Sequence, residues 1–496
     1  MERIHHHIAG KQVAGESGRH GDVFNPATGE KTHEVDFAST DEVGAAVSAA
    51  AAAAPAWRET SLAKRSDILF SIRQTLDAHR ADIARAITAQ HGKVLSDAMG
   101  EVARGLENVD FACGIPTLLA GRYAEQASTG VDVYSIRQPL GVVAGITPFN
   151  FPAMVPMWMF ANAIACGNTF VLKPSEKDPL ASVIIADLLA GAGLPDGVFN
   201  VVHGDKEAVD ALLEHPVVQA VSFVGSTPIA RYIYETAARN GKRVQALGGA
   251  KNHMVVLPDA DVDMAADAAV SAGYGSAGER CMAISVVVAV GKVADELVEA
   301  ISARLPALRI GDGTDPGSEM GPLITRQHRD KVASYIDSAR AQGGTVVVDG
   351  RSHPLYESDG FFLGASLVDN VTPEMDAYKD EIFGPVLSVV RAADYEQAVA
   401  LVNANQWGNG AAIFTRDGGA ARRFQFEVEA GMVGVNVPIP VPVGYFSFGG
   451  WKQSLFGDTH IYGPESVNFY TRAKVVTERW PDPSTSAVDL GFPQNR

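Results

Sequence analysis

The sequence is poor in cysteine and in basic residues. Its 496 residues include three cysteines, and this odd, sparse count offers no disulfide framework and fits a reducing compartment such as the cytoplasm. The 41 Lys and Arg residues are outnumbered by 58 Asp and Glu residues, so the formal net charge is −17. Nucleic-acid binding needs a basic footprint and anionic membranes attract basic segments, so we expect neither as a partner.

No stretch has the composition of a membrane span or of a targeting signal. The uncharged run 151–172 contains two prolines, two asparagines and a glycine, which predicts a buried helix followed by a central strand. The N-terminus lacks the apolar core of a signal peptide and the Arg- and Ser-rich composition of a transit peptide. His5, His6 and His7 have no Cys or acidic ligand cluster beside them, so we expect the solvated start of a strand and no metal site.

The remaining composition is that of a globular α/β protein with two or three domains. A capping box at Ser39 and Glu42 opens a helical region that extends over 39–115. From residue 141 onward, apolar strands alternate with helices, which is typical of a doubly wound parallel sheet. The strands of this unit are expected at 141–147, 169–173, 198–202, 220–224 and 243–247.

A second unit with the same alternation follows, which predicts two doubly wound parallel-sheet domains with a ligand-binding cleft between them. Segment 131–137 alternates like an exposed strand, and 467–477 alternates without an evident partner. We expect 467–477 to be either an arm that joins the sheet of another subunit or an ordinary edge strand. The strands of the second unit are expected near 254–257, 285–290, 345–348, 386–390, 411–414 and 433–437.

Polar groups follow several strands of the first unit, where ligands of such sheets bind. No G-x-G-x-x-G fingerprint is present. Segment Gly225–Thr227 opens a helix directly after a strand, so its backbone N–H groups can face a phosphate, although Ser and Thr are also ordinary N-caps. Glu176 follows Lys173 by three residues, and it can bind ribose hydroxyls or form a surface ion pair with that lysine.

Cys281 lies in the stretch 275–285, next to Arg280. A thiol attacks electrophiles as the thiolate, and a neighbouring cation lowers its pKa from about 8.5. Two interpretations stay open from these residues alone: a reactive nucleophile, or an inert buried cysteine before a strand.

Seven motifs together resemble the aldehyde dehydrogenase superfamily over essentially the whole chain. They are Pro148–Pro152, Lys173–Glu176, Phe223–Thr227, Leu247–Gly249, the Cys281 segment, Glu381–Pro385 and Phe448–Lys452. The resemblance implies an NAD-binding domain, a catalytic domain and a small β oligomerisation arm in a homodimer or homotetramer. We expect the NAD-binding domain at 1–119 and 139–248, the catalytic domain at 249–442, and the arm at 120–138 and 463–483.

The resemblance also implies a role for each matching residue. Cys281 would attack an aldehyde carbonyl, and the Asn150 side chain with the Cys281 N–H would form the oxyanion hole. Glu381 would bind the nicotinamide ribose, and Phe383 would pack near the nicotinamide. Glu176 would repel a 2′-phosphate, so NAD is expected rather than NADP. Further cofactor contacts are expected from Lys173 at the adenosine ribose, Ser226 at the pyrophosphate, and Thr147, Phe149, Lys177, Gly225 and Gly248.

The sequence departs from the hydrolytic members of the superfamily, which carry a Glu-Leu-Gly-Gly carboxylate that activates water. Here the base position is Ala246 or Leu247, depending on a one-residue offset. Without a base the attack of water slows by roughly 10²–10⁴, so the thioester would wait for a thiol such as coenzyme A. Glu279, two residues before Cys281, is an alternative base.

The absent base and segments 249–253, 278–282 and 446–451 resemble one subfamily, the CoA-acylating methylmalonate-semialdehyde dehydrogenases. Their substrate carries a carboxylate, and Arg104 and Arg280 stand where this subfamily binds it. A planar guanidinium suits a carboxylate. The alternative for Arg104 is an ion pair within its own helix, with Glu101 or Glu107 as the partner.

The expected reaction is the NAD-dependent, CoA-acylating oxidation of methylmalonate or malonate semialdehyde, with loss of CO₂, to propionyl-CoA or acetyl-CoA. This resemblance implies a cytoplasmic enzyme of valine or inositol catabolism. Two alternatives stay open. One is a hydrolytic NAD-dependent aldehyde dehydrogenase, and the other is a non-catalytic protein that keeps the fold for structural or NAD-binding purposes.

Overall fold

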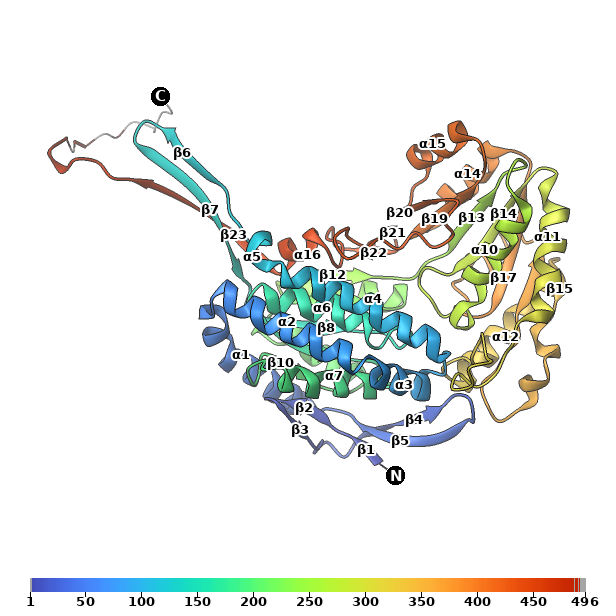
Figure 1. The fold of residues 1–496 in the computed structure, drawn as a ribbon, viewed down its shortest axis with the longest axis horizontal. Helices are drawn as coiled ribbons and strands as arrows, with labels where there is room; N and C mark the ends of the chain where they lie inside the picture. The colour runs from blue at the N-terminus through green and yellow to red at the C-terminus, as the bar shows by residue number, and fades with distance from the viewer. Residues whose placement is uncertain (1, 486, 489, 491–496) are drawn as a thin grey trace.

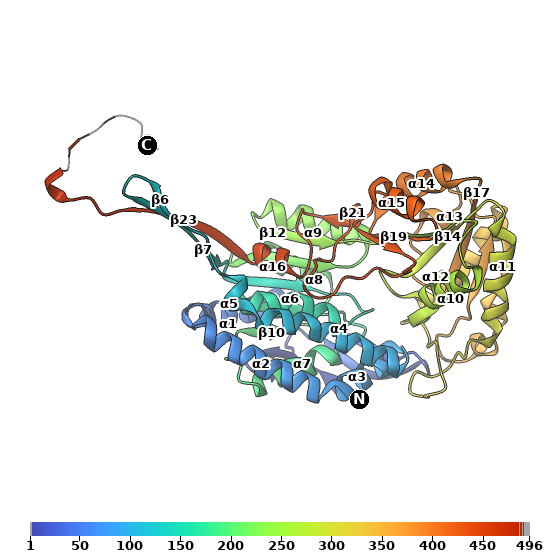
Figure 2. The same ribbon diagram turned by 45° about the horizontal axis from the view of Figure 1, so that its top comes forward.

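The computed structural model describes residues 2–485, 487–488 and 490, and it has the expected α/β architecture. Two large sheets with their helices lie side by side, and a long three-stranded arm projects from the first (Figures 1 and 2). No helix within the described residues is both long enough and apolar enough to cross a membrane.

The first sheet has eight strands, and the five at its centre are parallel. Their order is β12-β11-β8-β9-β10, so the chain builds one half outward from β8 and then returns to the other side of it. Ligands of doubly wound sheets bind at this reversal, which lies here between β8 and β11. The five strands are β8 (Val142–Ile146), β9 (Thr169–Lys173), β10 (Phe199–Val201), β11 (Val218–Val224) and β12 (Arg243–Leu247). The helices that connect them are α6 (Met154–Ala165), α7 (Leu180–Gly191), α8 (Lys206–Glu214) and α9 (Thr227–Arg239).

The edges of this sheet contain strands that the sequence analysis did not predict. β2 (His6–Ile8) pairs antiparallel with β10. Because β2 joins the sheet, His6 and His7 are 1% and 2% exposed, and the His6 ring stacks on His203. The expectation of a solvated strand start was therefore wrong for these two histidines. The two outermost strands of this sheet are β3 (Lys11–Val13) and β22 (Leu455–Phe456). Two small sheets are separate from it: one consists of β18 (Trp407–Gly408) and β21 (Trp451–Lys452), and the other of β1 (Glu2–Ile4), β5 (Glu30–Asp36) and β4 (His20–Asn25).

The helical region predicted over 39–115 is present, and it begins with the predicted capping box. The Ser39 hydroxyl accepts a hydrogen bond from the Glu42 N–H, and the Glu42 carboxylate accepts one from the Ser39 N–H. The uncharged run 151–172 forms α6 and β9, as predicted, and α6 packs against α4. The five helices are α1 (Thr40–Glu59), α2 (Leu62–Ala78), α3 (Arg80–His91), α4 (Leu95–Cys113) and α5 (Ile115–Leu118).

The second sheet has seven strands in the order β15-β16-β17-β14-β13-β19-β20. Its neighbours are parallel except β15 and β16, and β16 is a short strand that the sequence analysis missed. The strands are β13 (Asn252–Val256), β14 (Ile284–Val290), β15 (Thr345–Val348), β16 (Ser366–Asp369), β17 (Val386–Ala392), β19 (Gly410–Phe414) and β20 (Met432–Val435). The helices are α10 (Val262–Tyr274), α11 (Val293–Arg304), α12 (Arg326–Ala341), α13 (Asp376–Lys379), α14 (Tyr395–Ala404) and α15 (Gly418–Glu427).

The projecting arm is an antiparallel sheet of β6 (Tyr123–Ser128), β7 (Val131–Pro139) and β23 (Thr471–Arg479) (Figure 1). β23 pairs with β7 along its whole length and forms the edge of a sheet in its own chain, which is one of the two alternatives expected from sequence. The predicted strand also starts four residues too early, because Val467 lies buried in helix α16 (Pro464–Phe469). The domain boundaries and an oligomerisation role for the arm stay predictions.

Candidate active site

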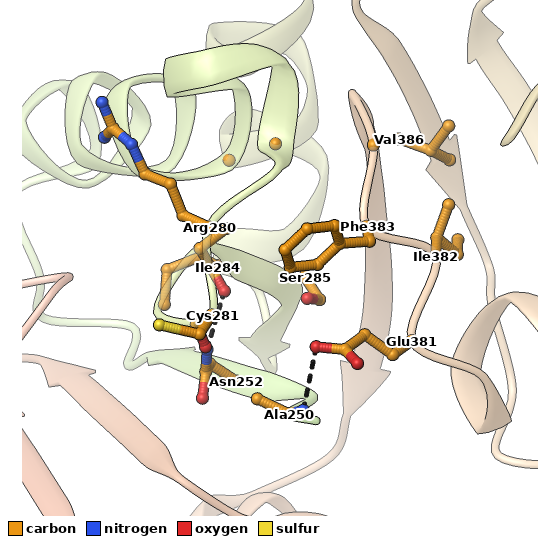
Figure 3. Close-up of a pocket in the computed structure, with 14 residues that line it drawn as sticks. Ala250, Asn252, Arg280, Cys281, Ile284, Ser285, Glu381, Ile382, Phe383 and Val386 are labelled. Atoms are coloured by element: carbon orange, nitrogen blue, oxygen red, sulfur yellow. Dashed lines mark hydrogen bonds between the residues drawn. The ribbon is translucent and has the colours of Figure 1, made fainter. Parts of the chain in front are cut away.

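Cys281 lies in a short loop between α10 and β14. The backbone before it turns sharply, because Ser276, Ala277 and Gly278 all have positive φ angles, of 54°, 52° and 75°. A Cβ atom at Gly278 would lie 2.4 Å from the Gly384 carbonyl oxygen, so only glycine fits there. This turn places the Cys281 loop on one side of a pocket, and the segment that carries Glu381 lines the other side (Figure 3).

The Cys281 carbonyl is held by two asparagines that the sequence analysis did not single out. Asn252 Nδ2 donates to it at 2.9 Å, and Asn409 Nδ2 donates at 3.1 Å. The Asn252 side chain uses both its N–H donors and its oxygen, since Nδ2 also donates to the Ala283 carbonyl and Oδ1 accepts from the Gly410 N–H. The main chain at Cys281 is therefore fixed by Asn252 at the start of β13 and by Asn409 in the residue between β18 and β19. Asn252 belongs to one of the quoted motifs, whereas nothing local marks Asn409.

The surroundings of Cys281 do not favour its thiolate in the absence of a ligand. Desolvation raises the pKa of the Cys281 thiol to about 12, the nearby Glu381 carboxylate raises it further, and Arg280 opposes them weakly. Figure 3 shows the Arg280 side chain extending away from Glu381, and its guanidinium donates to Asp97 at 2.6 Å. Arg280 does lower the thiol pKa, as expected for a neighbouring cation, but burial outweighs it and the net shift is upward.

Asn150 follows β8 and is 3% exposed. Its side-chain Nδ2 donates to the Glu279 carbonyl at 3.1 Å, which links it to the Cys281 loop. Its backbone carbonyl accepts from Lys93 Nζ at 2.5 Å. Asn150 follows a strand of the first sheet and Cys281 precedes a strand of the second, and the two residues line one cavity of about 230 Å³.

That cavity brings together eight of the residues predicted from sequence. It also contains His328 and Lys331 of α12, which the sequence analysis missed because α12 reads as an ordinary polar helix. The eight predicted residues are Phe149, Asn150, Gly225, Ser226, Gly248, Cys281, Glu381 and Phe383.

Glu381 and Phe383 form one wall of the cavity. Glu381 Oε1 accepts from the Ala250 N–H at 3.0 Å, and desolvation raises the pKa of its carboxyl to about 7. Phe383 has a positive φ of 58° and packs edge-on against Phe149, with 5.8 Å between ring centroids. His328 Nε2 donates to the Phe383 carbonyl at 2.7 Å and fixes this strained residue.

The remaining predicted cofactor residues lie at the carboxyl ends of β8 and β9. Lys173 Nζ is 3.2 Å from Glu176, so the ion pair considered from sequence exists, and Glu176 keeps a 36% exposed side chain. Lys177 Nζ lies 5.3 Å from the Phe149 ring centroid. The Thr147 hydroxyl is buried and has no partner among the described residues.

Helix α9 presents a free N-terminus to this cavity. Ser226 is the exposed N-cap, and its hydroxyl makes no hydrogen bond to the helix. Thr227 Oγ1 is instead occupied, because it accepts from the Gly249 N–H and from Trp407 Nε1. Unpaired N–H groups at the start of a helix favour a phosphate. Together with the unpaired Thr147 hydroxyl, this end of the cavity fits a dinucleotide.

Neither of the two arginines expected to bind a carboxylate lines this cavity, and both already have partners. Arg280 does line the pocket of Figure 3 together with Cys281 and Glu381. Arg104 Nη1 contacts both Glu107 carboxylate oxygens, at 2.7 and 2.8 Å, and its Nη2 donates to the Pro442 carbonyl at 2.8 Å. The ion pair within helix α4 is therefore present, with Glu107 as the partner. Arg280 pairs with Asp97, as described above.

No titratable side chain occupies the base position of the hydrolytic enzymes. Ala246 and Leu247 are both buried on β12. Glu279 is 0% exposed, and its carboxylate accepts from the Ile324 N–H and lies 3.6–3.7 Å from His328 and His91. Desolvation raises the pKa of Glu279 to about 8. None of these contacts involves Cys281, so they do not support Glu279 as the alternative base.

Comparison with known proteins identifies the family. The profile of the aldehyde dehydrogenase family matches residues 13–476. A malonate-semialdehyde dehydrogenase of Pseudomonas aeruginosa is 58% identical over 99% of this chain and 100% of its own. The mitochondrial, acylating methylmalonate-semialdehyde dehydrogenase of Arabidopsis thaliana is 47% identical, covering 100% of this chain and 81% of its own. A Sinorhizobium meliloti protein named as a methylmalonate-semialdehyde dehydrogenase, solved as a complex with NAD, has a TM-score of 0.96 and 54% identity over 98% of this chain and 99% of its own. The chain belongs to the aldehyde dehydrogenase family.

Proposed function

We propose that this protein catalyses the NAD-dependent, CoA-acylating oxidation of malonate or methylmalonate semialdehyde. One observation carries the proposal: Cys281 and Asn150 line one cavity, while the position of the hydrolytic base holds the apolar residues Ala246 and Leu247. The relatives are named for these two substrates, malonate semialdehyde and methylmalonate semialdehyde, and the match covers 100% and 81% of their own chains.

Cys281 would act as the nucleophile in the first half of the reaction. Its thiol must lose a proton before it attacks the aldehyde carbonyl, because only the thiolate is nucleophilic. The oxygen of the resulting thiohemiacetal would be stabilised by Asn150 Nδ2 and the Cys281 N–H, and one such donor is typically worth a factor of about 10²–10³ in rate. Collapse of the thiohemiacetal releases a hydride and leaves a thioester on Cys281.

NAD, when bound, would accept that hydride. The free N-terminus of α9 would bind the pyrophosphate, with Ser226 at its start. Glu176 and Lys173 would hold the adenosine ribose, and Glu381 the nicotinamide ribose. Phe383, which is in edge-on contact with Phe149, would pack near the nicotinamide. Thr147, Lys177, Gly225 and Gly248 would complete the site.

The substrate carboxylate would bind to Arg104 and Arg280. The acyl group on Cys281 then carries this carboxylate β to the thioester carbonyl. Loss of CO₂ leaves an electron pair that the thioester carbonyl delocalises, and protonation of that carbon gives the propionyl or acetyl thioester. The thiolate of coenzyme A attacks this thioester, and the Cys281 thiolate leaves.

The finer properties of the protein belong to the same proposal. We infer a cytoplasmic enzyme of valine or inositol catabolism that forms a homodimer or homotetramer through the arm of β6, β7 and β23. Its partners would be the carboxylated semialdehyde and coenzyme A. The hydrolytic alternative loses support, because the Glu279 carboxylate is engaged by the Ile324 N–H and lies beside His328 and His91.

The proposal is tested by NADH formation from malonate semialdehyde with and without coenzyme A. Without coenzyme A, we expect a burst near one NADH per active site followed by slow turnover, because no base activates water. Coenzyme A should restore fast steady turnover. Cys281→Ala should abolish NADH formation and leave NAD affinity nearly unchanged. Fast steady turnover without coenzyme A would contradict the acylating function and favour hydrolysis.

A further inference from the structure

Two buried charged residues lie beneath the turn that carries Asn150. Lys93, in the loop between α3 and α4, and Glu101, on α4, form an ion pair of 2.8 Å, and both side chains are 0% exposed. Neither residue belongs to the motifs that suggested the active site, and neither lines the 230 Å³ cavity.

The other polar contacts of this pair converge on residues 150–154. Lys93 Nζ donates to the Asn150 carbonyl at 2.5 Å, and it lies 4.4 Å from the centroid of the Phe151 ring. Glu101 Oε1 accepts from the Ala153 N–H at 2.8 Å and from the Met154 N–H at 3.2 Å. One turn of backbone is thus held at both ends by a single pair of opposite charges.

The pair also supplies what the local sequence of the turn lacks. Helix α6 begins at Met154, and its N-cap residue Ala153 has no side chain that can accept from the first N–H groups. Glu101 reaches over from α4 and takes that role, and a carboxylate is favoured at a helix N-terminus by the helix dipole as well. The start of α6, and the turn before it, therefore depend on a residue of another helix.

A buried ion pair is a poor device for stability alone, because apolar residues of similar volume often serve equally well or better. Unlike apolar residues, an ion pair can also orient its neighbours, since it places hydrogen-bonding atoms at defined points. Here those atoms fix the backbone from the Asn150 carbonyl to the Met154 N–H. The Asn150 side chain donates to the Glu279 carbonyl beside Cys281.

We propose that Lys93 and Glu101 are positioning residues that set the Asn150 side chain for stabilisation of the oxyanion. The pair acts through Asn150 and touches neither substrate nor cofactor. This inference rests on the proposed function, since it assigns Asn150 the oxyanion role described there.

The test is a double-mutant cycle on single-turnover NADH formation from malonate semialdehyde at saturating NAD. Removing one partner leaves a buried charge unpaired, so the perturbation is the double substitution Lys93→Met with Glu101→Leu. A displacement of about 1 Å at a reacting group can cost 10²-fold, so we expect the rate to fall by about 10- to 100-fold. In an Asn150→Ala background, where the positioned group is gone, the same substitutions should change the rate less than twofold.

Two further variants complete the design. Glu101→Asp keeps both charges but shortens the side chain, so it cannot bridge Lys93 and the Ala153 N–H together, and it should slow the single turnover even if the double variant does not fold. Arg73→Gln with Asp110→Asn removes an exposed ion pair between helix α2 and the same helix α4, and it should leave the rate unchanged. NAD affinity should be unaffected in all of them.

An equal fold-loss in the presence and absence of the Asn150 side chain would overturn the inference, because the pair would then act independently of it. An unaltered rate in Glu101→Asp would overturn it as well. These outcomes are distinct from failure of the proposed function, which would appear as absence of the NADH burst, or of its dependence on coenzyme A, in the wild-type protein.

Discussion

Arg104 offers the sharpest test of substrate choice, because its ion-pair role and its substrate-binding role predict different results. The guanidinium makes two contacts to Glu107 and one to the Pro442 carbonyl, which leaves other N–H donors for a ligand. The Arg104 and Glu107 side chains are 34% and 39% exposed. An exposed pair of this kind contributes about 0.3–0.5 kcal/mol to stability, so Arg104→Leu should scarcely change the melting temperature.

The effect on catalysis should be much larger if Arg104 binds the substrate carboxylate. A charge-assisted hydrogen bond is worth about 1.5–3 kcal/mol. At about 1.4 kcal/mol per factor of ten, Arg104→Leu should lower kcat/KM for malonate semialdehyde by roughly 10- to 150-fold. Propionaldehyde, which has no carboxylate, should be almost indifferent to the substitution.

The assay compares kcat/KM for the two aldehydes by NADH absorbance at saturating NAD and coenzyme A. Glu107→Gln is the matched control, because it removes the ion pair and keeps the arginine. It should leave the preference for malonate semialdehyde intact. If Arg104→Leu slowed both aldehydes equally, and Glu107→Gln did the same, the role of Arg104 would be confined to its helix. Arg280→Leu is a less clean probe, since it also releases Asp97 beside the Cys281 loop.

Two predictions follow from the raised pKa values. Because desolvation and Glu381 raise the pKa of Cys281 to about 12, its alkylation by iodoacetamide in the ligand-free protein should still be rising steeply at pH 9, and Glu381→Gln should accelerate it at pH 8; a plateau near pH 8.5 would contradict this. The Glu279 carboxyl has a pKa of about 8 in the folded state. Between about pH 4.5 and pH 8 the folded protein therefore keeps this proton, whereas the unfolded chain loses it. The free energy of unfolding falls over this range by up to about 1.4 kcal/mol per pH unit. Glu279→Gln should therefore gain stability relative to wild type from pH 5 to pH 8 in chemical denaturation, and a constant difference would refute the assignment.

The sequence predicted the elements that are buried on both faces more reliably than those that are half-exposed. The run Ile284–Val290 is apolar apart from Ser285 and forms a central strand, as expected. β16, Ser366–Asp369, is just as buried but only four residues long and ends in an aspartate, so its local pattern is that of a loop. Helix α12 reads as an ordinary polar helix, and nothing in its own pattern marks His328 and Lys331 as residues that line the cavity.

The candidate site divides in the same way between local and distant information. Ser226 could be placed at the start of a helix from its own neighbours, since a strand ends just before it. The approach of Asn150 to the Cys281 loop depends on how two sheets pack, and only the resemblance to a family suggested it. Lys93 and Glu101 carried no signal at all, because a lysine in a loop and a glutamate on a helix are ordinarily solvated. Burial of charge becomes visible only in three dimensions.

The choice between water and a thiol as the second nucleophile follows from what surrounds Cys281. A thiol with a pKa of about 8.5 is already about 3% ionised at pH 7, whereas water, with a pKa of about 15.7, needs a base to react. Glu381 is the one carboxyl among the described residues that line the cavity, and its Oε1 is engaged by the Ala250 N–H. Glu279 is turned toward Ile324, and the hydrolytic base position is apolar. A site that withholds a base therefore slows water far more than coenzyme A, and it selects acyl transfer without any contact specific to the thiol.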